Sequence, residues 1–246
     1  MRDWEKEKQG RVAFIRAQLR DAGTDGIVFG NSGGKDSALV GILCRMACDR
    51  VLGVIMPCGS KRNYGSDMED AWAVANQYDI ASVVVDLTET RDAMLAAAEK
   101  VGRIDARSLS NMAPRLRMTA LYAVAQSRGS LVAGTGNRSE RHMGYFTKWG
   151  DGAYDFNPIA DLTVREIYAF LRHLGAPAAI IEKAPSAGLY EGQTDEKDMG
   201  ISYEAIDRCL LEGEAEPADL AVMERYHSLS RHKRKGAAMY GDVGGK

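Results

Sequence analysis

The chain has 246 residues, of which 45% are hydrophobic and 27% charged, a composition typical of a globular protein large enough for one α/β domain. Its formal net charge of −2 provides no general attraction to nucleic acid or to an anionic membrane, so neither is expected as a partner. Residues 1–20 lack the apolar core of a signal peptide, and no apolar run approaches membrane-spanning length. The four cysteines include no CxxC pair. We therefore expect a cytoplasmic protein with reduced thiols.

Apolar runs alternate with helical patterns as far as Gly134. This alternation predicts an α/β fold, with a doubly wound parallel sheet flanked by helices and a Rossmann-like strand order of 3-2-1-4. The later helices read as additions to a single domain over residues 1–246. The expected strands are 26–29, 51–56, 82–86 and 131–134, and the expected helices are 3–22, 38–49, 67–78, 88–101, 115–126 opened by Pro114, 163–174, 203–211 and 217–229.

Residues 30–37, Gly-Asn-Ser-Gly-Gly-Lys-Asp-Ser, join the first expected strand to the start of a helix. The unpaired backbone N–H groups of a first helical turn suit a phosphate, and the glycines let the backbone approach it closely. Lys35 adds a cation, and two serines add hydroxyl groups. The stretch is not a Walker A loop, because Phe29 stands where that motif needs glycine and Asp36 follows the lysine.

The sequence Ser-Gly-Gly-Lys-Asp-Ser resembles the pyrophosphate loop of the N-type ATP pyrophosphatases, which split ATP between its α- and β-phosphates and adenylate an acceptor. The resemblance implies this fold and ATP as a co-substrate. Asp36 fits beside an anion only if a divalent cation lies between them, which indicates Mg²⁺. A glycine-rich turn in an ordinary strand–helix unit is the simpler alternative. The expected ATP contacts are Gly30, Asn31, Ser32, Gly33, Gly34, Lys35, Asp36 and Ser37.

A long polar loop follows the fourth expected strand. In the expected order, the first and fourth strands are neighbours where the sheet changes winding direction, and ligands bind at their carboxyl ends. A loop of this length in a compact domain is usually functional. The candidate substrate segments are therefore 135–157, which carries Glu140, Lys148, Asp151 and Asp155, then 183–196, and the basic C-terminal tail 231–246.

Three stretches look like ammonia-dependent NAD synthetase: Gly134 to Glu140, Gly144 to Gly152, and Lys183 to Glu196. The resemblance implies a ligase that amidates deamido-NAD (nicotinic acid adenine dinucleotide) with ammonia to NAD, the last step of NAD biosynthesis. In that reaction the carboxylate attacks the α-phosphorus of ATP, an acyl-adenylate forms, and AMP and pyrophosphate are released. The family also implies a homodimer. Members that use glutamine carry an extra amidohydrolase domain, for which 246 residues leave no room.

The same resemblance implies roles for single residues. Asp36 and Glu140 would bind Mg²⁺, because this hard cation takes carboxylate and phosphate oxygens. Asp151 would receive ammonium. The expected catalytic set is Asp36, Glu140, Asp151 and Lys148; Thr135 and Ser186 would join the ATP contacts; and the residues expected to hold deamido-NAD are Arg115, Lys148, Asp155, His232 and Lys233.

The chain departs from the family pattern at Val164 and after the basic cluster 231–235, where Gly236-Ala-Ala-Met stands in place of the usual proline, and two other functions stay open. Val164 stands where the family usually has a lysine that contacts ATP, and Arg165 lies about 100° away around a helix. Another adenylating ATP pyrophosphatase, such as a tRNA thiolase or a GMP synthetase core, is one alternative. A nucleotide-binding module without turnover is the other, although such a module would be expected to lose Asp36 or Glu140.

Overall fold

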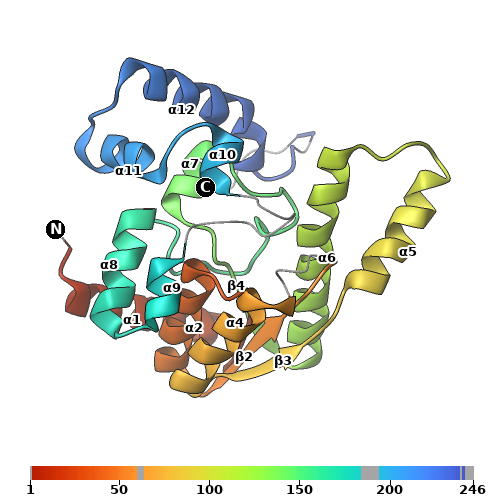
Figure 1. The fold of residues 1–246 in the computed structure, drawn as a ribbon. Helices are drawn as coiled ribbons and strands as arrows, with labels where there is room; N and C mark the ends of the chain where they lie inside the picture. Colours follow the sequence, from red (N-terminus) through yellow and green to blue (C-terminus); the bar gives the residue numbers. More distant parts are fainter. Residues whose placement is uncertain (1, 60–63, 184–193, 239, 242–246) are drawn as a thin grey trace.

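A parallel sheet forms the centre of the computed structural model, which describes residues 2–59, 64–183, 194–238 and 240–241 (Figure 1). The strands are β1 (Gly26–Gly30), β2 (Arg50–Ile55), β3 (Ala81–Val84) and β4 (Ser130–Ala133). Their order is β3-β2-β1-β4, which confirms the order expected from the sequence. The winding direction therefore reverses between β1 and β4, and the carboxyl ends of these strands meet at one crevice.

Helices cover both faces of the sheet and add a lobe beside its carboxyl edge (Figure 1). None of those in the described ranges combines the length and the apolar composition that crossing a membrane requires. The helices are α1 (Trp4–Asp21), α2 (Lys35–Ala47), α4 (Ser66–Gln77), α5 (Thr88–Glu99), α6 (Ala106–Ser127), α7 (Arg138–Met143), α8 (Val164–Leu174), α9 (Ala178–Glu182), α10 (Asp195–Met199), α11 (Tyr203–Glu212) and α12 (Pro217–Leu229), followed by a 3₁₀ turn (Arg231–Lys233).

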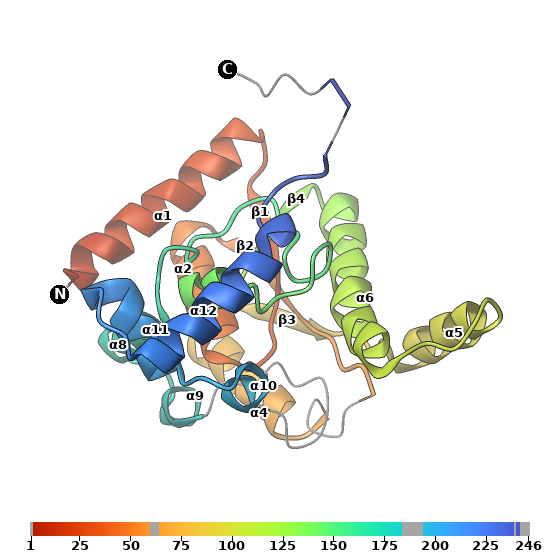
Figure 2. The same ribbon diagram turned by 90° about the horizontal axis from the view of Figure 1, so that it is seen from above.

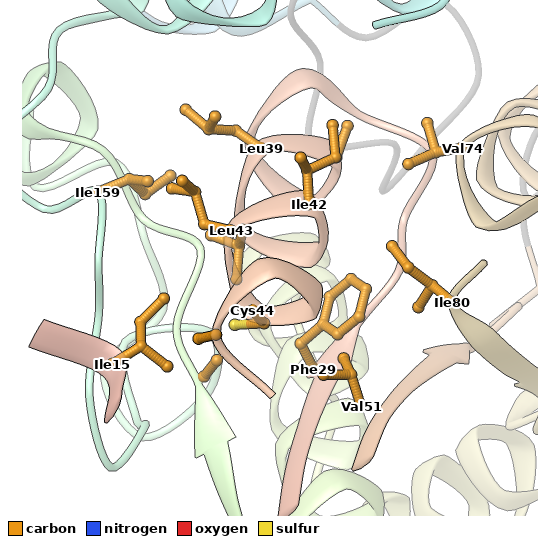
Figure 3. Close-up of a cluster of buried hydrophobic side chains, with 14 of the residues drawn as sticks. Ile15, Phe29, Leu39, Ile42, Leu43, Cys44, Val51, Val74, Ile80 and Ile159 are labelled. Carbon is orange, nitrogen blue, oxygen red and sulfur yellow. The ribbon is translucent and has the colours of Figure 1, made fainter. Parts of the chain in front are cut away.

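Alternate residues of β1 point into two separate cores, because successive side chains of a strand face opposite sides. Ile27 and Phe29 pack with α1, α2, α4 and α8 on one side, where Figure 3 shows Phe29 beside Val51. Val28 packs on the other side, together with residues of α6. Both faces of the sheet are covered, so the strands appear in the sequence as continuous apolar runs.

A third group of buried apolar side chains joins α7, α8, α11 and α12 into a lobe. Met143, Val164, Ile206 and Met223 are among its members. Figure 2, viewed from above, shows α12 crossing over the central part of the molecule. The lobe thereby brings the C-terminal part of the chain close to loops that follow the strands.

The helix expected at 115–126 begins earlier than predicted. α6 starts at Ala106, because the side chain of Asp105 accepts a hydrogen bond from the backbone N–H of Ser108 (2.6 Å) and caps the helix. Pro114 therefore lies inside α6 rather than at its start. The prediction relied on the enrichment of proline at the first helical position, but Pro114 is buried in the interior of the helix.

Arg11 of α1 joins that helix to the segment that follows the long polar loop. Its guanidinium forms two bonds to the Asp161 carboxylate, with Nη1 to Oδ1 at 2.7 Å and Nη2 to Oδ2 at 3.0 Å. It also donates to the Pro158 carbonyl and to Glu7. We expect Arg11→Met to lower the free energy of unfolding by about 1–3 kcal/mol, since a charge-assisted network is lost while Asp161 can regain water.

The Arg11 contribution should depend on pH. Burial opposes ionisation of Asp161, but Arg11 and Arg2 outweigh burial and hold the pKa of this carboxyl below its usual value. The stabilisation is therefore present above the unfolded-state pKa of about 4 and is lost as the pH falls through the lower folded-state pKa. Urea unfolding at neutral and acidic pH measures this. Arg16→Met, which removes bonds only to the carbonyls of Met46 and Ala47, is the control and should leave the pH dependence unchanged.

Candidate active site

A cavity of about 790 Å³ lies at the carboxyl ends of β1, β2 and β4. Its volume is in the range of sites that enclose a cofactor or a drug-sized ligand. Residues of α6 and of the 3₁₀ turn Arg231–Lys233, called the C-terminal turn below, complete its walls. The expected site residues that line it are Gly30, Asn31, Ser32, Gly34, Lys35, Asp36, Ser37, Thr135, Glu140, Asp151, His232 and Lys233.

The loop between β1 and α2 is built around two glycines. Gly33 has φ +71°, and a Cβ added there would lie 2.0 Å from the carbonyl oxygen of Asp67, so a side chain does not fit. Gly34 is the N-cap of α2 and provides no side-chain cap to the first helical N–H groups. The Ser37 hydroxyl donates to the Gly34 carbonyl (3.0 Å) and holds the turn together. The loop thus presents uncapped N–H groups of a 13-residue helix beside the cavity, a suitable site for phosphate.

Asn137 connects this loop to the loop after β4. Its side-chain Nδ2 donates to Asp36 Oδ1 (3.1 Å), and its backbone N–H donates to Glu140 Oε2 (3.1 Å). Asn137 and Glu140 form a capping box that starts α7, so the segment 135–157 contains a helix and is not a continuous loop. The two expected metal ligands therefore lie on either side of one asparagine.

The charges of the side chains around Asp36 and Glu140 do not balance. Lys35 is buried, and its Nζ lies 2.7 Å from Asp36 Oδ2. Burial alone would lower the pKa of Lys35, but the charges of Asp36 and Glu140 outweigh it and raise that pKa. Burial and the charge of Asp36 likewise raise the pKa of Glu140 well above its usual value. One lysine thus faces two carboxyl groups, whose ionised forms leave an excess of negative charge.

This excess of negative charge fits a divalent cation. Mg²⁺ is typically held by one or two carboxylates together with substrate phosphates and water, and Asp36 and Glu140 match that requirement beside a loop whose free N–H groups suit phosphate. Across the ranges that the structure describes, no group of three or more His, Cys, Asp or Glu side chains could hold a metal. The cation would therefore take its remaining ligands from a nucleotide and from water.

Asp151 lies in a tight turn of the same segment. Its Oδ1 accepts the backbone N–H of Thr147 (2.9 Å), and the side chain stays accessible from the cavity. The protein around the carboxyl nevertheless displaces water and raises the pKa of Asp151 above its usual value. Lys233 fastens the C-terminal turn to this segment, because its Nζ donates to the carbonyls of Gly144 (2.8 Å) and Phe146 (2.7 Å).

The residues expected to hold deamido-NAD do not all lie together. Lys148 Nζ donates to the His232 carbonyl (2.9 Å), and Arg115 donates to the Lys148 carbonyl (3.5 Å), so these three are connected. Asp155 instead accepts a backbone N–H of β4 (2.7 Å) and the Tyr122 hydroxyl (3.2 Å). Burial and the charge of Asp155 raise the pKa of Tyr122 to about 12. Arg115, Lys148 and Asp155 do not line the main cavity.

Two side chains of the site lie in segments that the sequence analysis named as functional, but it did not single them out. Asn137 could have been found from its spacing to Glu140, since Asn-x-x-Glu is a capping-box pattern. Lys183 lines the cavity, and its Nζ contacts Asp67 Oδ1 (2.8 Å) and Asp70 Oδ2 (2.5 Å) on α4. No spacing in the sequence connects Lys183 to α4, so only the fold reveals this cluster.

Valine stands at position 164, where the family usually has a lysine that contacts ATP, but other lysines line the cavity. Val164 is buried in the lobe, and the neighbouring Arg165 pairs with Glu212 at 2.5 Å. Arg165 does not line the cavity, whereas Lys35 and Lys183 do. Ser186, expected to contact ATP, lies outside the described residues.

Comparison with known proteins shows similarity over nearly the whole chain. A family model described as NAD synthase matches residues 7–236. An NH₃-dependent NAD⁺ synthetase of Carboxydothermus hydrogenoformans is 44% identical over 236 residues, which cover 95% of this chain and 96% of that protein. The solved NH₃-dependent NAD synthetase of Campylobacter jejuni is 31% identical with a TM-score of 0.79 and coverages of 97% and 100%. A solved NMN synthetase of Francisella tularensis is 33% identical with a TM-score of 0.93 and coverages of 98% and 100%.

Proposed function

Because the chain belongs to the NAD synthase family, we propose that it catalyses the ATP-dependent amidation of deamido-NAD with ammonia, which gives NAD, AMP and pyrophosphate. It is an enzyme, a ligase that forms a C–N bond. The observation that supports this most strongly is the convergence of Asp36 and Glu140 on Asn137, beside the loop that we expect to bind phosphate. The use of ATP supports a cytoplasmic location.

We assign the adenylation half of the reaction to the two loops at the crevice. The N–H groups of residues 33–37, with Lys35, would hold the phosphates of ATP, and Thr135 would contact the nucleotide from the other loop. The deamido-NAD carboxylate would attack the α-phosphorus, and the bond to the β-phosphate oxygen would break with pyrophosphate as the leaving group. Two anions meet in this step, so their repulsion must be neutralised by fixed cations.

We assign Mg²⁺ binding to Asp36 and Glu140. When bound, the cation would neutralise phosphate charge and favour departure of pyrophosphate. Lys35 then keeps Asp36 in place through its 2.7 Å ion pair, and Asn137 orients both carboxylates.

The amidation half is assigned to the segment that carries Asp151. Asp151 would accept a proton from ammonium, which must lose one before its nitrogen has a lone pair to attack the acyl carbon. Lys233 and His232 lie at the same wall of the cavity and would face the dinucleotide, with Lys148 and Arg115 behind them. Asp155 would act by supporting the end of β4 rather than by contact from the main cavity.

A coupled assay tests this function. Purified protein with ATP, Mg²⁺, ammonium and deamido-NAD should produce NAD, AMP and pyrophosphate in equal amounts. Pyrophosphate release that does not depend on deamido-NAD would exclude the proposal and favour another adenylating pyrophosphatase.

Amidation of nicotinic acid mononucleotide is a second candidate function. It is favoured by one observation, the TM-score of 0.93 to the Francisella tularensis protein described as an NMN synthetase. The curated relatives at 40–44% identity are NAD synthetases, so we expect the dinucleotide to be preferred. Comparing kcat/KM for the two acceptors in the same assay decides between them.

We propose that the protein works as a homodimer through β3, α5 and α6. Among the described residues of α5 none is buried, and Figure 1 shows this helix extending away from the body of the molecule. Val83 and Val84 of the edge strand and Met94 of α5 are all exposed. An exposed edge strand is a template for pairing with another chain, and exposed apolar side chains that lie together mark interaction surfaces. Light scattering should give twice the chain mass of 26.8 kDa, and Val84→Glu should reduce it towards the single value.

A further inference from the structure

Three fully buried polar side chains lie around the first turn of α7, the helix that carries Glu140. Asn137 and Ser139 are 0% exposed, and Asp207 of α11 is 1% exposed. Asn137 bonds to Asp36 and to Glu140 at the proposed Mg²⁺ site. Ser139 and Asp207 do not line the main cavity, so direct contact with a substrate does not account for their burial.

Asp207 connects three helices through its two carboxylate oxygens. Its Oδ1 accepts the hydroxyl of Ser139 on α7 (2.5 Å), and its Oδ2 accepts the backbone N–H of Arg165 on α8 (2.6 Å). The Ser139 oxygen in turn accepts the backbone N–H of Val164, the first residue of α8 (3.3 Å). One side chain of α11 therefore holds α7 and α8 in a fixed relation.

Capping of α8 does not by itself explain a buried carboxylate. Burial raises the pKa of Asp207 above its usual value in spite of these bonds, which reflects the cost of keeping the charge away from water. The helix already has a capping box formed by Thr163 and Glu166, and a neutral side chain could accept the N–H of Arg165 at a smaller cost. The charge instead strengthens the bond from the Ser139 hydroxyl, because charge-assisted hydrogen bonds are about twice as strong as neutral ones.

The position of α7 depends on such outside contacts, because the helix has only six residues. A helix this short gains little from its own hydrogen bonds, so its neighbours decide where it lies. Two successive residues bond to α11: Arg138 Nη2 donates to the carbonyl of Leu210 (3.0 Å), and Ser139 donates to Asp207. Glu140 follows them directly in the chain.

We propose that Asp207 is a positioning residue for the Mg²⁺ site, an inference that rests on the proposed function. It holds Ser139, and this bond fixes the turn of α7 from which Asn137 and Glu140 face Asp36. Mg²⁺ demands nearly ideal octahedral geometry with short bonds, so a displaced turn would weaken its binding. Side chains that orient metal ligands from behind typically contribute 10–100-fold to metal affinity, although they do not touch the metal.

The factor by which Mg²⁺ strengthens nucleotide binding measures this role without turnover. The probe is an ATP analogue with a methylene group between its α- and β-phosphorus atoms, titrated by calorimetry with and without Mg²⁺. We expect Asp207→Asn, which can accept only one of the two bonds, to lower that factor by about tenfold, and Ser139→Ala to do the same. The affinity without Mg²⁺ should stay within about twofold. The double variant should lose no more than the weaker-binding single variant, since the two side chains act as one unit.

Thr163→Val is the matched control. Thr163 is 0% exposed and caps α8, the same helix that Asp207 contacts, but its side chain bonds to Glu166 rather than to α7. This substitution should lower the melting temperature because a buried cap is lost. It should leave the strengthening of nucleotide binding by Mg²⁺ unchanged.

Two results would assign the bonds of Asp207 to stability alone and overturn the proposal. One is a lower melting temperature with unchanged strengthening by Mg²⁺ in the Asp207 and Ser139 variants, and the other is an additive loss in the double variant. If Asp207→Asn does not fold, Ser139→Ala, which keeps the bond to Arg165, decides by the same criterion. If neither variant folds, stability accounts for the network and the proposal fails.

The proposed function is tested by a separate measurement. Exchange of pyrophosphate into ATP that does not depend on deamido-NAD would refute that function, whereas the calorimetric titration contains no acceptor. Absence of any strengthening by Mg²⁺ in the unaltered protein would overturn the metal assignment and the role of Asp207 with it. The two failures are thereby distinguished.

Discussion

Glu140→Gln is expected to lower kcat/KM for adenylation of deamido-NAD by about 10²–10³-fold, the range seen when one electrostatic contact to a transition state is removed. The physical reason is the loss of one negative charge from the proposed Mg²⁺ site. Glutamine can still accept the backbone N–H of Asn137, so the capping box and α7 should remain. The assay is ATP–pyrophosphate exchange at several Mg²⁺ concentrations, and the variant should need more Mg²⁺ than the unaltered protein.

The chain contains a matched control for this substitution. Glu166 occupies the same place in a second capping box, where it accepts the backbone N–H of Thr163 at the start of α8 (3.0 Å). It does not line the main cavity. Glu166→Gln should therefore leave the exchange rate and its Mg²⁺ dependence within about twofold of the unaltered protein, a change worth less than about 0.5 kcal/mol. Equal effects of the two substitutions would mean that Glu140 acts only as a helix cap.

Gly33→Ala is expected to raise KM for ATP by about tenfold or more and to reduce stability by about 2 kcal/mol or more. Alanine at φ +71° is strained, and its Cβ would lie 2.0 Å from the Asp67 carbonyl oxygen, so the loop or the first turn of α4 must move. Movement there would also disturb Lys183, which contacts both Asp67 and the Gly33 carbonyl (3.4 Å).

The strain and the contact can be separated with Gly213. This residue has φ +75°, but a Cβ added there meets nothing within 4 Å. Gly213→Ala should thus cost only the left-handed strain, about 1–2 kcal/mol, and leave KM for ATP unchanged. Thermal unfolding of both variants measures the loss of stability, and ATP titrations measure the change in KM for ATP. A Gly33→Ala protein with normal KM for ATP would argue against phosphate binding by this loop.

The sheet could be predicted because its determinants are local. Continuous apolar runs, each closed by a polar or glycine residue, indicated buried parallel strands, and the confirmed strand order followed from their alternation with helices. The main local error was the start of the helix expected at 115–126. The stronger signal there was the Asp105 cap, which starts α6 one residue later at Ala106.

The candidate site was predictable to the extent that its residues lie next to strand ends. Asp36 and Glu140 could be placed at one crevice from their distance along the chain to β1 and β4. Lys183 could not, because its carboxylate partners on α4 belong to a distant part of the sequence. Asp155 shows a different limit: its carboxylate is bonded to the backbone of β4, a contact that no motif in the sequence indicates.

Transfer of an oxygen atom from the acceptor to AMP tests the central claim most directly. Deamido-NAD labelled with oxygen-18 in its carboxylate would be converted with ATP and ammonium, and the AMP and pyrophosphate analysed by mass spectrometry. If the crevice between β1 and β4 forms an acyl-adenylate, the AMP should carry one labelled oxygen and the pyrophosphate none. Unlabelled AMP, or label in pyrophosphate, would contradict this account.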